Sequence, residues 1–337
     1  MGPSGSGKTT LLNTLAQRQT ATVQGRISIN GQERPLATHR AITAFVEQED
    51  TLIGSLTVEE TLGYSARLAL PATATAHELR GRVQRLIEAF GLREQSKTLI
   101  GTPLQKGLSG GQKRRVSVAT QLITSPKILY LDEPTSGLDS TASYEIMHFL
   151  RDFARRNRIL MIASIHQPST KTFELFDKVC LLSQGKTCFY GTMPELISFF
   201  ASVDLPIPSL TNPAEHMLDV TNVDFSAQKT ASQASFEKIL AAWHRSPQAQ
   251  QIQHLINSEQ EEVRQRLLSH TASHRPSNAR QVLTLMHRAF VKSYRDLTTY
   301  WIRVLMYLGL AVMMGTVWLR LSQTQEHIQP FINAIVR

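Results

Sequence analysis

Apolar residues along the first 200 positions alternate between short continuous runs and longer stretches with helical spacing. Lys127–Leu131, Ile159–Ile165 and Val179–Leu182 are runs rich in strand-forming residues, and helical patterns lie between them. Short runs of this kind are typical of buried parallel strands. The pattern predicts an α/β domain over residues 1–200.

Three local signals mark the boundaries of elements in this domain. Asn30-Gly31 ends a predicted strand over Gly25–Gly31 with a turn. Thr57, followed by Glu60, forms a capping box that opens a helix. A further helix carries an apolar stripe that ends at a glycine, and we expect it in the core: Leu79, Val83, Leu86, Ile87, Phe90 and Gly91.

The pattern changes after residue 200. Pro206, Pro208 and Pro213 interrupt the chain, and Ser, Gln, His and Ala are frequent as far as residue 279. Such a composition does not favour a packed core. We predict a linker over residues 201–279, partly helical or disordered.

The last sixty residues have membrane character. Residues 280–298 are predicted as a basic amphipathic connecting helix, with one apolar face formed by Val282, Leu285, Met286, Ala289 and Phe290. An uncharged run, Val304–Leu319, follows Arg303 and precedes Arg320. It is slightly shorter than the roughly 17–25 residues of a spanning helix, but flanking arginines can extend to the interface.

We therefore expect the first transmembrane helix over residues 299–321, and the start of a membrane domain over 322–337. Basic residues precede the run, which places its N-terminal side in the cytosol. A buried core helix of a soluble domain is the alternative.

Composition narrows the class of protein. The chain has 337 residues and a net charge of +9, and 42% of its residues are hydrophobic. The basic residues are dispersed and no nucleic-acid recognition module is visible, so no nucleic-acid partner is predicted. Cys180 and Cys188 are the two cysteines. A disulfide framework is not expected, and a reducing cytosolic setting suits most of the chain.

Residues 2–9 match the phosphate-binding pattern G-x-x-x-x-G-K-[ST]. Lys8 is expected to reach the β- and γ-phosphates, and the Thr9 hydroxyl to bind Mg²⁺. The helix from Thr10 to about Ala16 presents its positive end to the same anion. The predicted nucleotide-binding residues here are Gly2, Pro3, Ser4, Gly5, Ser6, Gly7, Lys8, Thr9 and Thr10.

A second candidate site follows the apolar run that ends at Leu131. Asp132 and Glu133 are two carboxylates delivered by the end of a strand. We expect Asp132 to hold Mg²⁺ through water and Glu133 to polarise the attacking water as general base.

The string Leu108-Ser109-Gly110-Gly111-Gln112 resembles the signature motif of ABC ATPases. A serine and two glycine N–H groups at a helix N-terminus suit a γ-phosphate. In that family the phosphate belongs to nucleotide on the opposing subunit, so the resemblance implies a dimer with two shared ATP sites. Lys113, Arg114 and Arg115 follow, and we expect them to form a solvated helix face.

Other landmarks of the family occur in the same order along this chain. Gln48 resembles the glutamine of the Q-loop, which contacts Mg²⁺ and senses the membrane domain. Asp139, in Ser136–Asp139, resembles the D-loop aspartate. His166 follows an apolar run and resembles the switch histidine that contacts the γ-phosphate.

Finer strings resemble the G (White-type) subfamily: Ser164–Ser169, and Asn212–Glu215 followed by Leu218–Val220. The order of ATPase domain, connecting helix and first span also suits that subfamily. The resemblance implies a P-loop ATPase domain with a helical subdomain. It also implies that this ATPase uses ATP and Mg²⁺ to export lipids, sterols or amphipathic small molecules. It also implies a second half-transporter as partner, in a homodimer or a heterodimer, and contact with membrane lipid. The ATPase domain is expected in the cytosol, at the plasma membrane rather than an internal one.

Two features depart from this family pattern. The phosphate-binding loop opens the chain, so we expect the strand that normally precedes it to be missing. One span is visible where the family has several, so a translocation pathway is not expected from this chain alone. Two alternatives stay open: a truncated fragment that binds only nucleotide or a partner, and a soluble ABC-type ATPase that acts on nucleic acid or ribosomes.

Overall fold

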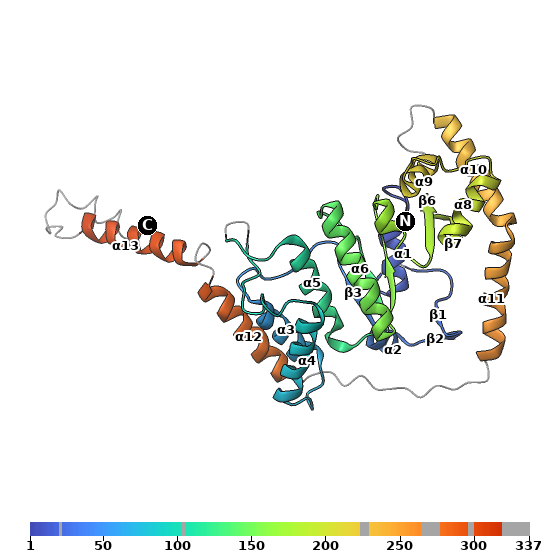
Figure 1. The fold of residues 1–337 in the computed structure, drawn as a ribbon. Helices are drawn as coiled ribbons and strands as arrows, with labels where there is room; N and C mark the ends of the chain where they lie inside the picture. The colour runs from blue at the N-terminus through green and yellow to red at the C-terminus, as the bar shows by residue number, and fades with distance from the viewer. Residues whose placement is uncertain (20–21, 103–104, 223–228, 264–276, 296–299, 319–337) are drawn as a thin grey trace.

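The computed structural model describes residues 1–19, 22–102, 105–222, 229–263, 277–295 and 300–318 (Figure 1). The strands are β1 (Ser28–Ile29), β2 (Gln32–Glu33), β3 (Thr43–Val46), β4 (Ile128–Leu131), β5 (Leu160–Ala163), β6 (Val179–Ser183) and β7 (Lys186–Gly191). The helices of the first 202 residues are α1 (Lys8–Leu15), α2 (Leu36–Ile42), α3 (Val58–Ala69), α4 (Ala76–Ala89), α5 (Gly110–Gln121), the 3-10 helix η1 (Leu122–Thr124), α6 (Ser140–Asn157), α7 (Thr170–Phe173) and α8 (Met193–Ser202). The later helices are α9 (Pro213–Thr221), α10 (Lys229–Arg245), α11 (Pro247–Val263), α12 (Asn278–Arg295) and α13 (Ile302–Trp318).

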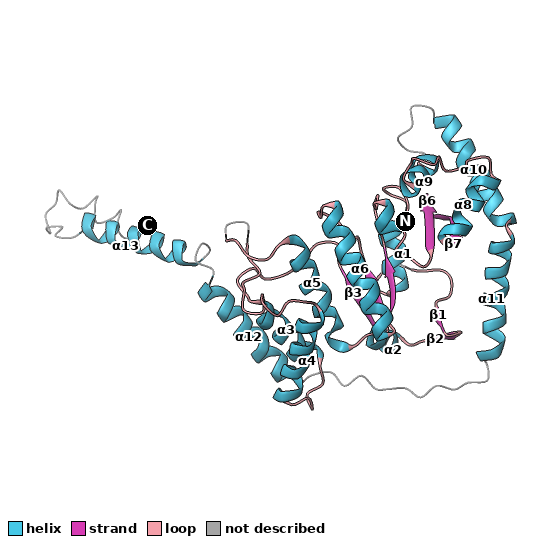
Figure 2. Cartoon of the chain, in the orientation of Figure 1, coloured by secondary structure: helices cyan, strands magenta, loops and turns pink. Residues whose placement is uncertain are grey.

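A parallel sheet of order β3-β4-β5 lies at the centre of the domain (Figure 2). All residues of the middle strand β4 are buried, as its continuous apolar run predicts. Val46, Leu131 and Ala163 are partners across the three strands, so the strands end in register. The loops that follow them therefore begin at one edge of the sheet, which is where open parallel sheets place their ligands.

The run Val179–Leu182 was expected as a parallel strand, and this prediction was wrong. β6 pairs antiparallel with β7. Gln184 and Gly185 connect them, with φ of 48° and 73°. Positive φ at both residues is the geometry of a tight hairpin turn. A continuous apolar run marks a buried strand, but it does not set the direction of the neighbouring strand.

The turn, the capping box and the apolar stripe that the sequence predicts are confirmed, whereas the strand predicted over Gly25–Gly31 is shortened to β1, Ser28–Ile29. Asn30 and Gly31 have φ of 52° and 72° in the turn between β1 and β2. Thr57 caps α3: its hydroxyl accepts from the Glu60 N–H at 3.2 Å, and the Glu60 carboxylate accepts from the Thr57 N–H at 2.9 Å. In the α4 stripe the side chains of Val83, Ile87 and Phe90 are buried.

The larger hydrophobic core joins the sheet to a helical unit. Side chains of α3, α4 and α5 pack with β4 and the inner face of α6 around Leu62, Phe90, Val116, Leu129 and Leu150, all of which are fully buried. Figure 1 shows α3, α4 and α5 gathered on one side of the sheet, with α6 crossing in front of it. This core fixes the position of α5 relative to the ends of β3 and β4.

A second core lies around the β6–β7 hairpin, on the other side of the molecule. α8 and α9 contribute to it, and α10 adds Phe236, Ile239 and Trp243, which are all buried. The segment predicted as a linker, 201–279, therefore contains three described helices, and two of them contribute buried side chains to this core. Residues 223–228 and 264–276 of that segment lie outside the described residues.

The predicted connecting helix corresponds to α12, which lies against α3. Arg295 binds the Glu60 carboxylate through both terminal nitrogens, at 2.7 and 2.9 Å, and Tyr64 Oη lies 2.8 Å from His287 Nδ1. Burial disfavours the charged form of Glu60, but the Arg295 and Thr57 hydrogen bonds outweigh it and lower the Glu60 pKa. The apolar side chains of the predicted face remain largely exposed, including Met286 at 63% and Phe290 at 71%.

The predicted transmembrane segment corresponds to α13. Its apolar side chains are exposed on all sides, from Ile302 to Met313. Among the residues that the structure describes, no helix combines the length and the apolar character needed to span a membrane. Residues 296–299 and 319–337 lie outside the described part, and with them the ends of the segment predicted over 299–321 and all of 322–337.

Candidate functional site

The phosphate-binding loop leads directly into α1. Its N-cap is Gly7, with φ of 93°, so no side chain caps the first turn of the helix. The first N–H groups of a helix have no intrahelical partner, so they remain available to an anion. Lys8 Nζ folds over the loop and donates to the carbonyl oxygens of Gly2 and Pro3, at 2.8 and 2.9 Å. Burial lowers the Lys8 pKa, and the carboxylates of Glu133 and Asp132 oppose that shift.

The β6–β7 hairpin binds the phosphate-binding loop through backbone hydrogen bonds. Leu182 N donates to the Met1 carbonyl at 2.8 Å, and Gly185 N donates to the Ser6 carbonyl at 3.1 Å. Gly2 lies so close to the strand that an added Cβ would stand 2.1 Å from the Leu182 carbonyl oxygen. Only glycine fits at this position without displacement of the backbone.

Three side chains and one backbone group connect α1 with the ends of β4 and β5. Thr9 Oγ1 donates to Asp132 Oδ1 at 3.2 Å. Ser164 Oγ donates to the same oxygen at 2.5 Å and accepts the Glu133 N–H at 2.8 Å. Asp132 and Ser164 are each 5% exposed. The sequence prediction did not include Ser164 among the site residues, although a polar residue within the apolar run Ile159–Ile165 was a usable signal.

Glu133 is held in a strained backbone conformation, with φ of 42°. A non-glycine residue in the left-handed region costs about 1–3 kcal/mol and is often found at functional sites. Here it turns the carboxylate toward Gln48, whose Nε2 donates to Glu133 Oε2 at 2.8 Å. The loops after β3 and β4 are therefore joined through the predicted metal-binding Gln48 and the predicted general base Glu133.

A cavity of about 630 Å³ opens at this edge of the sheet. Gln48, Glu133 and His166 line it together with Ser4 of the phosphate-binding loop. The other lining residues come from the segment after β4 and the start of α7: Thr135, Ser136, Gly137, Leu138, Ser140, Ser143, Gln167, Pro168, Ser169 and Thr172. The structure thus brings together the sequence-predicted base, the switch histidine and the Q-loop glutamine.

The oxygen atoms at this edge suit Mg²⁺. Mg²⁺ prefers oxygen ligands, usually keeps several waters, and is bound by one or two carboxylates plus substrate phosphates. The Thr9 hydroxyl and the buried Asp132 carboxylate supply such oxygens next to the phosphate-binding loop. In the described part of the chain, no three His, Cys, Asp or Glu side chains converge as a metal site. A metal here would depend on nucleotide and water for its remaining ligands.

The signature residues form a separate feature at the start of α5. Ser109 is the N-cap: its hydroxyl accepts from the Gln112 N–H at 3.3 Å, and Gln112 Oε1 accepts from the Ser109 N–H at 3.0 Å. Leu108 is buried, whereas Ser109 and Gly110 are exposed. The cavity lining contains none of Leu108–Gln112. Within one chain, therefore, the signature segment is not part of the site that holds Glu133.

Asp139 has a structural partner. It is the N-cap of α6, and its Oδ1 accepts the Ala142 N–H at 2.7 Å. Capping satisfies a helix N–H group that would otherwise lack a partner. The predicted nucleotide role of Asp139 stays a prediction.

The basic residues after the signature do not form a solvated face, so that expectation was wrong. Arg114 is 3% exposed, and its guanidinium points into the domain toward the loops after β3 and β4. Arg115 is half-buried and lies over the Phe149 ring, 5.3 Å from its centroid. The helical spacing in the sequence did not indicate which of the three basic side chains is buried.

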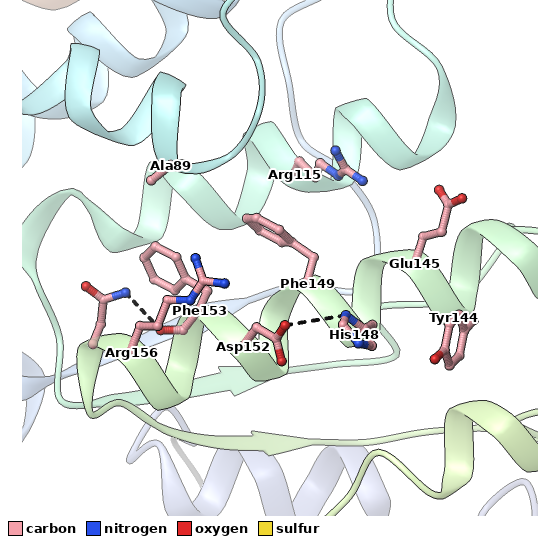
Figure 3. Close-up of a pocket in the computed structure, with 10 residues that line it drawn as sticks. Ala89, Arg115, Tyr144, Glu145, His148, Phe149, Asp152, Phe153 and Arg156 are labelled. Carbon is pink, nitrogen blue, oxygen red and sulfur yellow. Dashed lines mark hydrogen bonds and ion pairs between the residues drawn. The ribbon is translucent and has the colours of Figure 1, made fainter.

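A second cavity, of about 520 Å³, lies between α4, α5 and α6 (Figure 3). Phe149 and Phe153 project toward α4, and His148 pairs with Asp152 at 3.6 Å. None of the sequence-predicted site residues lines this cavity. It is therefore distinct from the edge of the sheet that carries Glu133.

Comparison with known proteins finds the family that the sequence motifs resemble. A family model described as "ABC transporter" matches residues 1–136, and one described as "ABC-2 type transporter" matches residues 166–310. In a solved structure, cbiO1 from Clostridium perfringens, part of the ABC transporter complex cbiONQ, the likeness covers 60% of this chain and 80% of that chain. Its TM-score is 0.51 and its identity 25%.

Two curated relatives belong to one branch of these transporters. ABC transporter G family member 11 of Arabidopsis thaliana is 38% identical over 352 residues, which cover 97% of this chain and 49% of the relative. The broad substrate specificity ATP-binding cassette transporter ABCG2 of Sus scrofa is 41% identical over 228 residues, 67% of this chain and 34% of the relative. The chain spans about half the length of the plant relative. The order of its motifs, its fold and these relatives together show that the chain belongs to the ABC transporter G family.

Proposed function

We propose that this chain binds and hydrolyses ATP with Mg²⁺, as the energy-coupling half of a dimeric ABC G-type transporter. The observation that carries the proposal is the meeting of Gln48, Glu133 and His166 in one cavity beside the phosphate-binding loop. ATP with Mg²⁺ supplies the phosphoryl group that is transferred to water.

Each site residue has a proposed role in ATP hydrolysis that suits its position. Glu133 accepts a proton from the attacking water, and its contact with Gln48 sets the direction of the carboxylate. Lys8 and the first N–H groups of α1 supply positive charge and donors to phosphate oxygens. The proposed Mg²⁺ ligands are Thr9, Gln48 and Asp132. His166, exposed at the cavity, donates to the transferred phosphate.

A second copy or a related half-transporter completes each site. The exposed signature residues lie outside the cavity of their own chain, as a motif used by a partner requires. We propose a head-to-tail dimer in which Leu108–Gln112 of one subunit contact nucleotide on the other. Homodimer and heterodimer are both compatible with this geometry.

We further propose that residues 299–321 enter a membrane, with the ATPase domain in the cytosol, at the plasma membrane rather than an internal one. The exposed apolar side chains of α13 and the match to an ABC-2 type transporter family up to residue 310 support insertion into a membrane. That match also favours a transporter over a soluble ATPase that acts on nucleic acid or ribosomes. The proposed cargo is a lipid, a sterol or an amphipathic small molecule.

The test is ATP hydrolysis by the chain in lipid nanodiscs. We expect phosphate release that stops when EDTA removes Mg²⁺ and is absent from Lys8→Met. Lys113→Gln, which changes a nearby charge outside the cavity, should keep the wild-type rate. Hydrolysis that continues unchanged in Lys8→Met would refute the proposed site. Absence of hydrolysis from the wild-type chain would favour the fragment that only binds nucleotide or a partner.

A further inference from the structure

Arg114 places a cation where a charged side chain is rarely found. It lies one turn into α5, after the signature residues, and is 3% exposed. An ionised group at such burial is costly unless it is paired and its hydrogen-bond donors are satisfied. The hydrogen-bond partners of the Arg114 guanidinium therefore show which segments of the chain it connects.

Those partners come from two loops. One is the segment after β3, and the other is the segment after β4. The contacts are Nη1 to the Glu47 carbonyl (2.8 Å) and to Asp50 Oδ1 (3.0 Å), Nη2 to the Gln48 carbonyl (3.0 Å) and the Glu133 carbonyl (2.8 Å), and Nε to the Pro134 carbonyl (3.0 Å). Asp50 balances the charge, and the other contacts are to backbone oxygens.

The shape of arginine suits this position. Its guanidinium is planar and offers five N–H donors in a fixed fork. The Gln48 and Glu133 carbonyls bind the same terminal nitrogen, so one planar group holds the backbones of both loops. A lysine keeps the positive charge for Asp50, but its three donors stem from a single nitrogen. It cannot reproduce contacts made from three nitrogens.

The two loops are also joined in front of Arg114, on the cavity side. Gln48 Nε2 donates to Glu133 Oε2 at 2.8 Å, while the backbone carbonyls of the same two residues accept from Arg114. These contacts link α5 directly to the backbone of the proposed general base. Ser109 is the N-cap of α5, about one turn before Arg114, and it is exposed and lies outside this cavity.

We propose that Arg114 couples the two ATP sites of the dimer. When Ser109 of a subunit engages nucleotide held by its partner, α5 shifts, and Arg114 carries that shift to Gln48 and Glu133 in the subunit's own site. Binding at one site thereby positions the catalytic groups of the other. This inference rests on the proposed dimeric ATPase. Arg114 is a positioning residue, because it contacts the two loops and not the reacting atoms.

Coupling predicts cooperative hydrolysis, which separates it from a structural role. ATP hydrolysis by the wild-type chain in nanodiscs should follow ATP concentration with a Hill coefficient clearly above 1, with an upper limit of about 2 for two sites. For Arg114→Lys we expect a Hill coefficient close to 1 and a kcat lower by about tenfold or more. Binding of a fluorescent ATP analogue to the diluted chain should stay within about twofold, since Lys8 and α1 are untouched.

Two further variants and one control distinguish a coupling role of Arg114 from a role in folding. Arg114→Met removes both the charge and the donors, and its melting temperature shows how far Arg114 supports folding. If it does not fold, Arg114→Lys and Asp50→Asn carry the test, because both leave a polar pair at positions 50 and 114. Lys113→Gln, on the same helix, is the matched control and should keep the wild-type Hill coefficient.

The outcomes separate the inference from the function on which it rests. A wild-type Hill coefficient of 1, or a coefficient in Arg114→Lys equal to that of the wild type, overturns the coupling role and leaves the ATPase in place. A lower kcat with unchanged cooperativity likewise overturns the coupling role, because Arg114 would then act only within its own subunit's site. Absence of hydrolysis from the wild-type chain removes the proposed function and the inference with it.

Discussion

Gln48 donates a hydrogen bond to the carboxylate of Glu133 across the ends of two adjacent parallel strands, at 2.8 Å. The contact exists because Val46 of β3 and Leu131 of β4 are register partners, so each residue lies two positions beyond its strand end. Glu133 also has φ of 42°, which places its side chain on the cavity side. Register and one strained residue together create the proposed catalytic pair.

Replacement of Gln48 by alanine should lower kcat for ATP hydrolysis by about tenfold or more, because the Glu133 carboxylate loses the donor that orients it. ATP binding measured without Mg²⁺ should change little. Gln253→Ala, an exposed glutamine on α11, is the matched control. Equal kcat in Gln48→Ala and the wild type would show that the contact has no catalytic role.

Removal of the Ser164 hydroxyl should destabilise the domain and slow hydrolysis. In Ser164→Ala the buried Asp132 carboxylate loses a donor, and the partly buried Glu133 N–H loses its acceptor. Leaving such groups unsatisfied costs about 1–3 kcal/mol. Thermal or urea unfolding measures the loss, with the exposed Ser198→Ala as control. If the two variants unfold alike, the Ser164 hydroxyl does not support the site.

Two glycine-to-alanine changes should act in opposite directions. In Gly2→Ala the new Cβ meets the Leu182 carbonyl oxygen at 2.1 Å, so the loop or the strand must shift, at about 1–3 kcal/mol. In Gly63→Ala, in the middle of α3, nothing lies within 4 Å, and helix propensity should stabilise the chain by about 0.5–1 kcal/mol. The unfolding free energies of both variants, measured against the wild type, test this prediction. Destabilisation of similar size in both would contradict the packing argument.

His39 should make stability depend on pH. It is 1% exposed, burial lowers its pKa below the ordinary 6.5, and the Leu15 carbonyl only partly opposes this. The folded chain then binds fewer protons than the unfolded chain. The His39 contribution is therefore present above pH 6.5 and is lost as pH falls below it toward the lowered pKa. Urea unfolding of wild type and His39→Leu between pH 7.5 and 5.5 should show a shallower pH dependence in the variant. Parallel curves would argue against a neutral buried His39.

The sequence predicted the local features of this site well, since they depend on neighbours in the chain. The phosphate-binding loop runs into α1, the run before Asp132 forms β4, and Thr57 caps α3. These follow from spacing, capping and burial, which a single sequence displays. The partnership of Gln48 with Glu133 was not predicted from spacing, because it depends on the register of two strands far apart in the chain.

What the sequence did not predict depends on long-range packing. Arg114 has a neighbour of the same type at 115, and only the position of α5 against β3 and β4 places one inside and leaves the other half-buried. The direction of β6 was set by its partner β7, which the apolar run could not indicate. The exposed apolar face of α12 also needed the structure, because α12 contacts α3 through polar pairs such as Arg295 with Glu60.

We propose that Glu133 activates water in an ATP site of this chain. The most direct measurement compares ATP binding and ATP hydrolysis by the wild type, Glu133→Gln and Glu145→Gln, an exposed glutamate on α6 that serves as control. We expect Glu133→Gln to bind ATP as the wild type does but to lose hydrolysis by about a hundredfold or more, the size of a general-base contribution. Glu145→Gln should stay active. Wild-type turnover in Glu133→Gln would contradict this role of Glu133.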